Sequence, residues 1–493
     1  MTPSRAPARR RPSAPPRRRA RRRRAALAVA ALLVLGGGYA LGDAADVVPG
    51  PLTTAPPPDP DPWPAAPGAE LPPALPGDPV LAAAGTDAPV PDPAVLADVV
   101  APFLGDPALG PSRAALVTDG LTGEVLLDVG ADAALEPAST VKLLTAAAAL
   151  AELDPAATFP TTVVLTDAGA ETPTAVLLAD GDNFLSAGAG DPGAVVGHAG
   201  LADLADDVAA SLAARGTGAL ALRLADPLAP TGPVRPPGWL AVDVANGYAA
   251  DVTGVAVNGG RLLDEEYSRR AADPGLAATD RLADLLRERG VDVAGDPARV
   301  DPAAVPDDAP VLGEVSSAPV ADVVGHMLRV SDNTSAELLG LLVARERGAP
   351  VTPVGAAQAI TDAVADLGVD VTGVALPDGS GLGDGGRLTP RAIAGVLEVA
   401  VQDEAFRPLL AGLPVAGLTG SLTDRLVDDP TGRGVVRAKT GSLFGVTSLA
   451  GVVVDADGRL LVFALSADQI TSTPGARAAF DDVAGALAGC GCR

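Results

Sequence analysis

Histidine, cysteine and aromatic residues are scarce in this chain of 493 residues. It has two His and two Cys, and both Cys lie among the last four residues, which argues against cysteine- or histidine-based zinc sites, haem ligation and iron–sulfur clusters. Aromatic residues make up 2% of the chain, too few for a platform on which single-stranded nucleic acid stacks. The net charge of −25 also disfavours a nucleic-acid partner.

Lysine is the second scarcity. Of the 36 Lys and Arg residues, only Lys142 and Lys439 are lysines. Arginine stays protonated in proteins, whereas a desolvated lysine can give up and regain a proton. The two lysines therefore mark positions at which proton transfer or a compact ammonium group could matter.

The N-terminal part has the organisation of an exported protein. Residues 1–24 contain 11 Arg and no acidic residue, and the uncharged apolar run 25–41 follows. This pattern predicts a basic cytoplasmic head and a signal anchor, or a cleaved signal peptide, with the rest of the chain extracytoplasmic. Residues 42–93 are predicted to form a semi-extended linker, since 49–93 contain 16 Pro.

Hydrophobic periodicity in the remainder predicts helices that cover an antiparallel sheet. The middle stretch, 160–310, mixes short apolar runs with Gly, Asp and Pro turns, which is an α/β pattern. The predicted strands are 114–118, 125–128, 435–440, 447–454 and 460–465, and the predicted helices are 139–153, 320–329, 335–345, 391–401 and 476–487.

Both lysines lie in motifs suited to acyl transfer. Ser139 precedes Lys142 by three residues, so the hydroxyl and the amine share one helix face, and the amine can activate the hydroxyl as a nucleophile. Lys439–Ser442 reads Lys-Thr-Gly-Ser on a predicted strand, where the glycine allows a substrate backbone to approach while the ammonium and hydroxyl bind a carboxylate. Ser331–Asn333 displays a hydroxyl and an amide between two predicted helices.

Each motif alone is weak, because a lysine is ordinarily a solvated or snorkelling cation. Their occurrence together and in this order makes coincidence improbable. The triple is the one shared by class A β-lactamases and penicillin-binding proteins.

Residues 113–485 further resemble the D-alanyl-D-alanine carboxypeptidase/endopeptidase family, the class C low-molecular-mass penicillin-binding proteins of peptidase family S13. The segments that carry the resemblance are Pro137–Leu143, Ser331–Asn333 with Ala336–Leu339, Arg437–Leu443, Asp378–Leu382, Leu388–Pro390 and Leu413–Gly417. The resemblance implies an α+β transpeptidase fold like that of serine β-lactamases, built from residues 94–159 and 311–493, with an inserted α/β domain at 160–310.

The resemblance also implies roles for the motif residues. Ser139 would attack the carbonyl of a D-Ala-D-Ala stem peptide and form an acyl-enzyme, with Lys142 as general base. Ser331 and Asn333 would assist proton transfer and orientation. The oxyanion hole would consist of the backbone N–H groups of Ser139 and Ser442.

The third motif is implied to bind substrate. Lys439 and Thr440 would hold the terminal carboxylate of the peptide, or that of a β-lactam antibiotic, beside Gly441 and Ser442. No metal or organic cofactor is implied. The implied partners are peptidoglycan stem peptides, β-lactams and the membrane through the anchor, with no nucleic acid.

Two other functions and several minor residues remain to be weighed. A β-lactamase is disfavoured because no Glu stands out as a class A deacylation base, and a non-catalytic binding protein is disfavoured by the intact motifs. Carboxypeptidase and endopeptidase preference stays open. His326 and Trp239 are interpreted as packing residues and Ser380 as a turn residue. Cys490 and Cys492 are interpreted as too closely spaced for an unstrained bridge, and therefore as incidental or paired between molecules.

Overall fold

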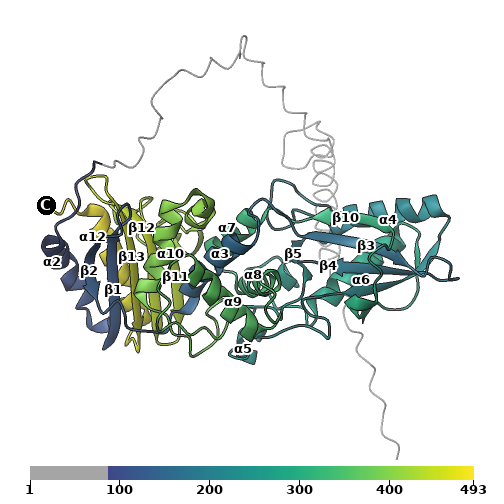
Figure 1. Ribbon diagram of the computed structural model, residues 1–493, viewed down its shortest axis with the longest axis horizontal. Helices are drawn as coiled ribbons and strands as arrows, with labels where there is room; N and C mark the ends of the chain where they lie inside the picture. The colour runs from purple at the N-terminus through teal and green to yellow at the C-terminus, as the bar shows by residue number, and fades with distance from the viewer. Residues whose placement is uncertain (1–86) are drawn as a thin grey trace, which may run out of the picture. The chain divides into compact units, whose positions relative to one another are not determined.

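The computed structural model describes residues 87–493, so the basic head, the segment 25–41 and most of the linker lie outside the described residues. A five-stranded antiparallel sheet, ordered β11-β12-β13-β1-β2, stands at one end of this part (Figure 1). Its strands are β1 (Ser112–Asp119), β2 (Val125–Val129), β11 (Arg437–Leu443), β12 (Val446–Val454) and β13 (Leu460–Asp468). Among residues 87–493, no helix is long and apolar enough to cross a membrane.

The two faces of this sheet contribute to two separate cores. Alternating residues on β1 divide between them, since Leu116 packs in one core and Val117 in the other. The outer core is closed by α2 (Pro93–Leu104) and α12 (Thr473–Gly489), and Asp92 caps the N-terminus of α2. The inner core is shared with α10 (Pro390–Gln402), whose N-cap is Thr389.

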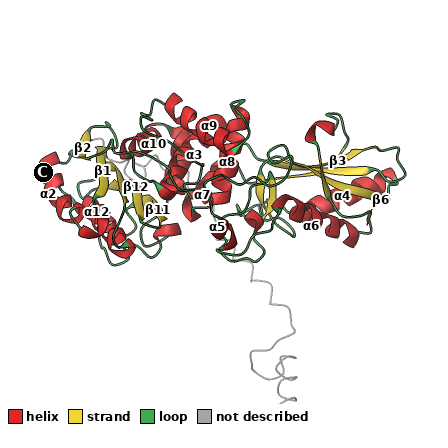
Figure 2. Ribbon diagram, turned by 90° about the horizontal axis from the view of Figure 1, so that it is seen from below, coloured by secondary structure: helices red, strands yellow, loops and turns green. Residues whose placement is uncertain are grey.

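Helices fill the middle of the described part (Figure 2). They are α3 (Val141–Glu152), α7 (Val320–Val330), α8 (Asn333–Glu346), α9 (Pro353–Asp366) and α11 (Arg407–Gly412). Ten consecutive residues of α3, from Val141 to Leu150, are buried, because other helices surround it. A helix that is apolar on all sides, as α3 largely is, lies in the centre of a core. The first two motifs lie at the starts of α3 and α8.

A second sheet lies at the opposite end, in the order β10-β3-β4-β6-β8, with β9 paired to β6. Its strands are β3 (Pro160–Thr166), β4 (Thr174–Ala179), β6 (Ala219–Ala225), β8 (Asp292–Val293), β9 (Ala298–Val300) and β10 (Val311–Ser316). The helices α4 (Leu201–Arg215) and α6 (Pro274–Glu288) pack on it. The sheet reaches Ser316, beyond the boundary at residue 310 expected from the sequence. We refer to residues 160–316 as the inserted region.

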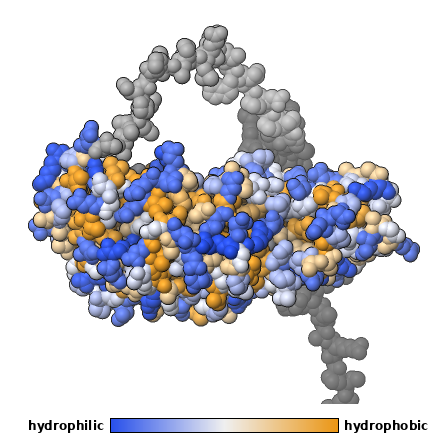
Figure 3. Space-filling model, viewed as in Figure 1, coloured by the Kyte–Doolittle hydropathy of each residue, from blue (hydrophilic) through white to orange (hydrophobic). Residues whose placement is uncertain are grey.

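Between the two ends, the inserted region approaches the helices through β5 (Asp182–Leu185), β7 (Val255–Val257) and the short α5 (Ala241–Ala245). The α+β fold of the prediction, with helices around an antiparallel sheet, is confirmed. Hydrophilic and hydrophobic residues are interspersed over the face drawn in Figure 3.

The ends of some elements differ from the sequence prediction. Ser139 lies in a 3₁₀ turn, Ala138–Thr140, just before α3, and Asn333 is the first residue of α8 instead of a loop residue. The interpretation of Cys490 and Cys492 was wrong, since the two are paired with each other. Their Cα atoms are 5.0 Å apart, within the range that a disulfide spans.

Candidate active site

Hydrogen bonds to the residue before it stabilise the turn that carries Ser139. The carbonyl oxygen of Pro137 accepts hydrogen bonds from the hydroxyls of Thr140, at 2.8 Å, and Ser448 of β12, at 2.7 Å. Ala138 has a φ of +49°, a backbone conformation that non-glycine residues rarely adopt. The turn therefore presents Ser139 in one conformation at the start of α3.

Lys142 lies directly below Ser139 and is fully buried. Its Nζ donates to Oγ of Ser139 at 3.0 Å, to Oδ1 of Asn333 at 2.6 Å and to the carbonyl oxygen of Ser380 at 2.7 Å. Burial lowers the pKa of Lys142 to about 8, although the nearby carboxylates, chiefly Asp378, oppose this shift. An amine with this pKa exists partly as the free base near neutral pH and can accept a proton from the serine.

The second motif lies across the junction of two helices. α7 ends at Val330, Ser331 follows with a φ of +60° that turns the chain, and α8 begins at Asn333. The Asn333 side chain donates from Nδ2 to the carbonyl oxygen of Tyr248, at 2.9 Å, while its Oδ1 accepts from Lys142. The amide is thereby held in one orientation, from a position far from Lys142 in the sequence.

Lys439 is likewise fully buried. Its Nζ donates to Oγ of Ser331 at 2.9 Å and to the carbonyl oxygen of its neighbour Thr440 at 2.8 Å. Burial, together with the charge of Lys142, holds the pKa of Lys439 well below its usual value. The hydroxyl of Thr440 is hydrogen-bonded to that of Ser421 at 2.7 Å, which adds a residue that no sequence motif indicated.

Gly441 meets a steric demand of the protein itself. A Cβ at this position would lie 2.0 Å from Oγ of Ser448 and 2.7 Å from the carbonyl oxygen of Pro137. The glycine thus lets β11 pack against the turn of Ser139. The sequence had suggested that it makes room for a substrate backbone, a role that stays a prediction.

These residues surround one cavity of about 540 Å³. Of the predicted site residues, its lining includes Ser139, Ser331, Asn333, Thr440 and Ser442. Lys142, Lys439 and Gly441 do not line the cavity. The two lysines are hydrogen-bonded to lining residues, and Gly441 packs against the turn that carries Ser139.

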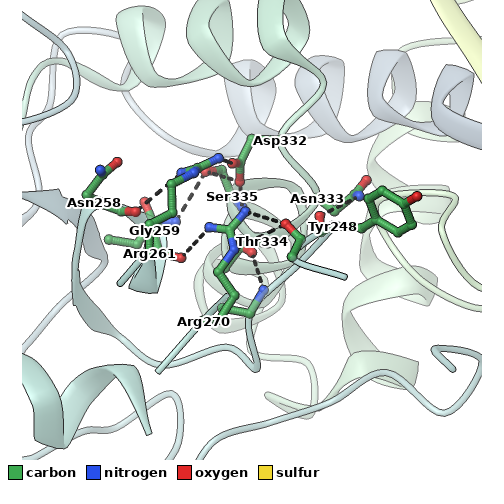
Figure 4. Close-up of polar contacts among 12 residues, drawn as sticks. Tyr248, Asn258, Gly259, Arg261, Arg270, Asp332, Asn333, Thr334 and Ser335 are labelled. Atoms are coloured by element: carbon green, nitrogen blue, oxygen red, sulfur yellow. Dashed lines mark hydrogen bonds and ion pairs between the residues drawn. The ribbon is translucent and has the colours of Figure 1, made fainter. Parts of the chain in front are cut away.

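The inserted region also contributes to the cavity wall, and Figure 4 shows its Arg261 and Arg270 beside Asp332. Its Arg261 forms an ion pair from Nη2 with Oδ2 of Asp332 at 3.1 Å, while Oδ1 of Asp332 accepts from N and Oγ of Ser335. Burial alone would raise the pKa of Asp332, but Arg261, the Ser335 N–H and Arg270 outweigh it and lower that pKa to about 2. The middle residue of the second motif is thus an ionised anchor for the inserted region.

A buried acidic cluster beneath Lys142 was not foreseen. The Asp378 carboxylate accepts backbone N–H bonds from Ser380, Gly381 and Gly383, and it accepts from Nε1 of Trp239 at 3.1 Å. Trp239 therefore does more than pack. This loop aims the Ser380 carbonyl at Lys142.

Glu337 completes the cluster from α8. Its Oε2 accepts from the N–H of Gly379 at 3.1 Å, and burial raises its pKa to about 8. The sequence did place Glu337 and Asp378 in family-like segments, but only the tertiary contacts show what each carboxyl holds.

The two remaining candidate residues, His326 and Ser380, do not line the cavity. The ring of His326 packs edge-on against Phe184, with centroids 4.9 Å apart, and it does not line the cavity. The Ser380 hydroxyl accepts from the N–H of Leu382, as a turn residue does. In the described part of the chain, no group of three or more His, Cys, Asp or Glu could hold a metal ion.

The sheet, the helices and this cluster define the class as a penicillin-binding protein, in which a serine backed by a lysine performs acyl transfer. A sequence model of the D-Ala-D-Ala carboxypeptidase 3 (S13) family matches residues 96–266 and 261–489. The chain belongs to this family and is a D-Ala-D-Ala carboxypeptidase, a hydrolase.

Individual relatives agree. The chain is 38% identical over 395 residues to a carboxypeptidase of Mycobacterium tuberculosis, covering 78% of this chain and 82% of that one. It is 36% identical over 428 residues to the carboxypeptidase DacB of Mycolicibacterium smegmatis, covering 85% and 90%. The crystal structure of penicillin-binding protein 4 of Haemophilus influenzae superposes with a TM-score of 0.65 at 19% identity, over 78% of this chain and 97% of that one, and supports the fold.

Proposed function

We propose that Ser139 is the nucleophile that removes the terminal D-Ala from peptidoglycan stem peptides through an acyl-enzyme. The observation that carries this proposal is the 3.0 Å hydrogen bond between Nζ of Lys142 and Oγ of Ser139, at the floor of the cavity. Lys142 in its neutral form takes the hydroxyl proton as Oγ attacks the penultimate carbonyl carbon. Asn333 keeps the amine in line with that hydroxyl.

The leaving amine of D-Ala then needs a proton. Ser331 lines the cavity and its Oγ accepts from Lys439, so we assign the proton donation to this pair. The amide bond breaks and D-Ala departs, and the proton that Lys142 took from Ser139 passes to the Ser331–Lys439 pair, which restores both. The neutral Lys142 then takes a proton from a water molecule whose oxygen attacks the ester carbon, and that proton returns to Oγ of Ser139 as the acid leaves. The backbone N–H groups of Ser139 and Ser442 would stabilise the oxyanion at each step.

Substrate recognition would fall to β11. Thr440 and Ser442 line the cavity beside Ser139, where hydroxyls can bind the free carboxylate of the peptide, while Lys439 supports this strand from behind. A β-lactam offers the same carboxylate and an acylating carbonyl, and a structure of the Haemophilus relative contains a β-lactam. The same reaction on a D-Ala joined to a second stem peptide would be the endopeptidase activity.

Peptidoglycan as substrate implies an extracytoplasmic role. We propose that the apolar run 25–41 anchors or exports the chain, with the basic residues 1–24 retained in the cytoplasm, and that residues 42–93 act as a spacer. The inserted region, expected at 160–310 and extended to Ser316 by β10, is proposed as a domain inserted into the catalytic domain.

One experiment separates the functions. The full chain, Ser139→Ala and the control Ser211→Ala, which changes a serine on α4 of the inserted region, are incubated with a fluorescent penicillin and with a peptide ending in D-Ala-D-Ala. Stable labelling and D-Ala release, both lost only in Ser139→Ala, are expected. Rapid penicillin turnover without D-Ala release would indicate a β-lactamase, and a parent that neither labels nor releases D-Ala would leave a binding role.

A further inference from the structure

The cavity wall contains more cationic side chains than the motifs account for. Four arginines line it: Arg261, Arg270, Arg425 and Arg477. Arg261 is neutralised by Asp332, and Arg425 is neutralised by Asp481, with 2.8 Å between Nη2 and Oδ1. Neither guanidinium is available as a net positive charge for a substrate.

Arg270 is also occupied, by backbone carbonyl groups. Its guanidinium donates to the carbonyl oxygens of Gly247 and Gly259, with the shorter bonds at 2.9 and 2.8 Å. This arginine holds the inserted region together beside the second motif, as Figure 4 shows.

Arg477 differs from the other three. It lies in the second turn of α12 and is exposed, and its Nε donates to Oγ of Ser442 at a long 3.3 Å. Among residues 87–493, Arg477 forms no ion pair, and Asp481, whose pKa burial raises and the charge of Arg477 lowers in part, is already paired with Arg425. Its guanidinium therefore stands at the cavity wall without a carboxylate of its own, next to the strand that carries the third motif.

Lys439, the cation that the motif itself supplies, is placed differently. Both of its hydrogen bonds are made to protein atoms, Oγ of Ser331 and the carbonyl oxygen of Thr440, and no part of its side chain is exposed. A carboxylate in the cavity would meet the hydroxyls of Thr440 and Ser442 before it met this amine. A direct charged contact to this carboxylate would come from another side chain of the wall.

We propose that Arg477, together with Ser442, binds the free carboxylate of the substrate and so selects peptides with an unblocked C-terminal residue. The planar guanidinium suits a carboxylate, with which it can form two parallel hydrogen bonds. Ser421 and Thr440, whose hydroxyls are paired, form the neutral side of the same subsite. This inference rests on the proposed function and adds a specificity-determining residue to it.

The test is a double-mutant cycle, in which one change is made to the side chain of Arg477 and the other to the C-terminal carboxylate of the substrate. Two substrates are compared, an N-acylated tripeptide ending in D-Ala-D-Ala and its C-terminal carboxamide, which lacks the charge. For Arg477→Ala, kcat/KM for the acid is expected to fall about 10- to 100-fold, as for the loss of a charged hydrogen bond, mainly through KM. The carboxamide, already a poorer substrate of the parent, should change less than about threefold, and Arg477→Lys should recover part of the loss.

Control variants distinguish a role of Arg477 in carboxylate binding from a purely structural role. Arg407→Ala removes an arginine that is 69% exposed and paired with Glu404, outside the cavity lining, and it should leave both substrates unaffected. Equal losses for acid and carboxamide in Arg477→Ala would reduce this residue to a structural role and overturn the inference. A parent that hydrolyses both substrates equally well would overturn it too. A parent that releases no D-Ala at all would instead refute the proposed function, which Ser139→Ala tests separately.

Discussion

The side-chain amide of Asn333 accepts a 2.6 Å hydrogen bond from Nζ of Lys142, 191 residues away in the sequence. The same amide donates to the inserted region through the carbonyl oxygen of Tyr248. An amide has one accepting and one donating end, so both contacts together fix its orientation. The position of the proposed general base therefore depends on the inserted region as well as on the catalytic helices.

Replacement of the proposed base tests its role in proton transfer. Lys142→Arg keeps the positive charge, but the guanidinium does not release its proton, so acylation should slow by about 10²- to 10⁴-fold, the usual contribution of a general base. The measurement is the second-order rate of labelling by a fluorescent penicillin, with the thermal midpoint recorded to show that the variant is folded. Unchanged labelling of a folded variant would refute the role of Lys142.

The pH dependence of acylation should report the same amine. Only the neutral amine can accept the serine proton, and burial lowers the pKa of Lys142 to about 8. Because the ammonium form dominates below that pH, kcat/KM should rise as pH increases toward 8 and then level off. A pH profile that is flat between about 6 and 9 would contradict this assignment.

Glu337 should influence the pH profile through its charge near Lys142. Burial raises the pKa of Glu337 to about 8, so this group is partly ionised at the midpoint of the profile, and its ionised form raises the pKa of Lys142 by attraction. Glu337→Gln should therefore move the midpoint of the profile to lower pH. The amide can still accept from the N–H of Gly379, which preserves the loop. Glu346→Gln, at the far end of the same helix, provides the control, and its midpoint should equal that of the parent.

Gly441 should tolerate no side chain. In Gly441→Ala, the new methyl group would overlap Oγ of Ser448 and the carbonyl oxygen of Pro137, which forces β11 away from the turn of Ser139. We expect a loss of stability of about 1–3 kcal/mol, as for other overpacked sites, and slower penicillin labelling. Gly218→Ala serves as the control because its new methyl group would have nothing within 4 Å, and a similar loss in both variants would contradict the steric explanation.

The ion pair between Asp332 and Arg261 should stabilise the junction with the inserted region. Asp332→Asn leaves a largely buried guanidinium unpaired, with an expected cost on the order of 3 kcal/mol in urea unfolding. Because the pKa of Asp332 is lowered to about 2, this contribution should be present above the unfolded value of about 3.9 and lost as pH falls toward 2. Equal stability of parent and variant at pH 7 would show that the pair contributes nothing net.

Much of the chemistry could be predicted from the sequence because it depends on local spacing. Ser139 and Lys142 are three residues apart, and one helical turn brings their side chains together whatever surrounds them. The strands β11, β12 and β13 were likewise predicted from alternation and turn residues. The 3₁₀ turn at Ser139 was missed, since it arises from contacts of Pro137 with Ser448 on a distant strand.

The sequence by itself determined the family, the order of the three motifs and the two lysines on which proton transfer is proposed to depend. Only the tertiary structure decided which groups meet those lysines. Desolvation depends on how completely other elements enclose a side chain, and charge interactions depend on distances across the fold. For that reason, three features could not be inferred from spacing along the chain: the lowered pKa values of Lys142 and Lys439, the carboxyl groups of Glu337 and Asp378 near Lys142, and the position of Arg477 at the cavity wall without an ion pair of its own.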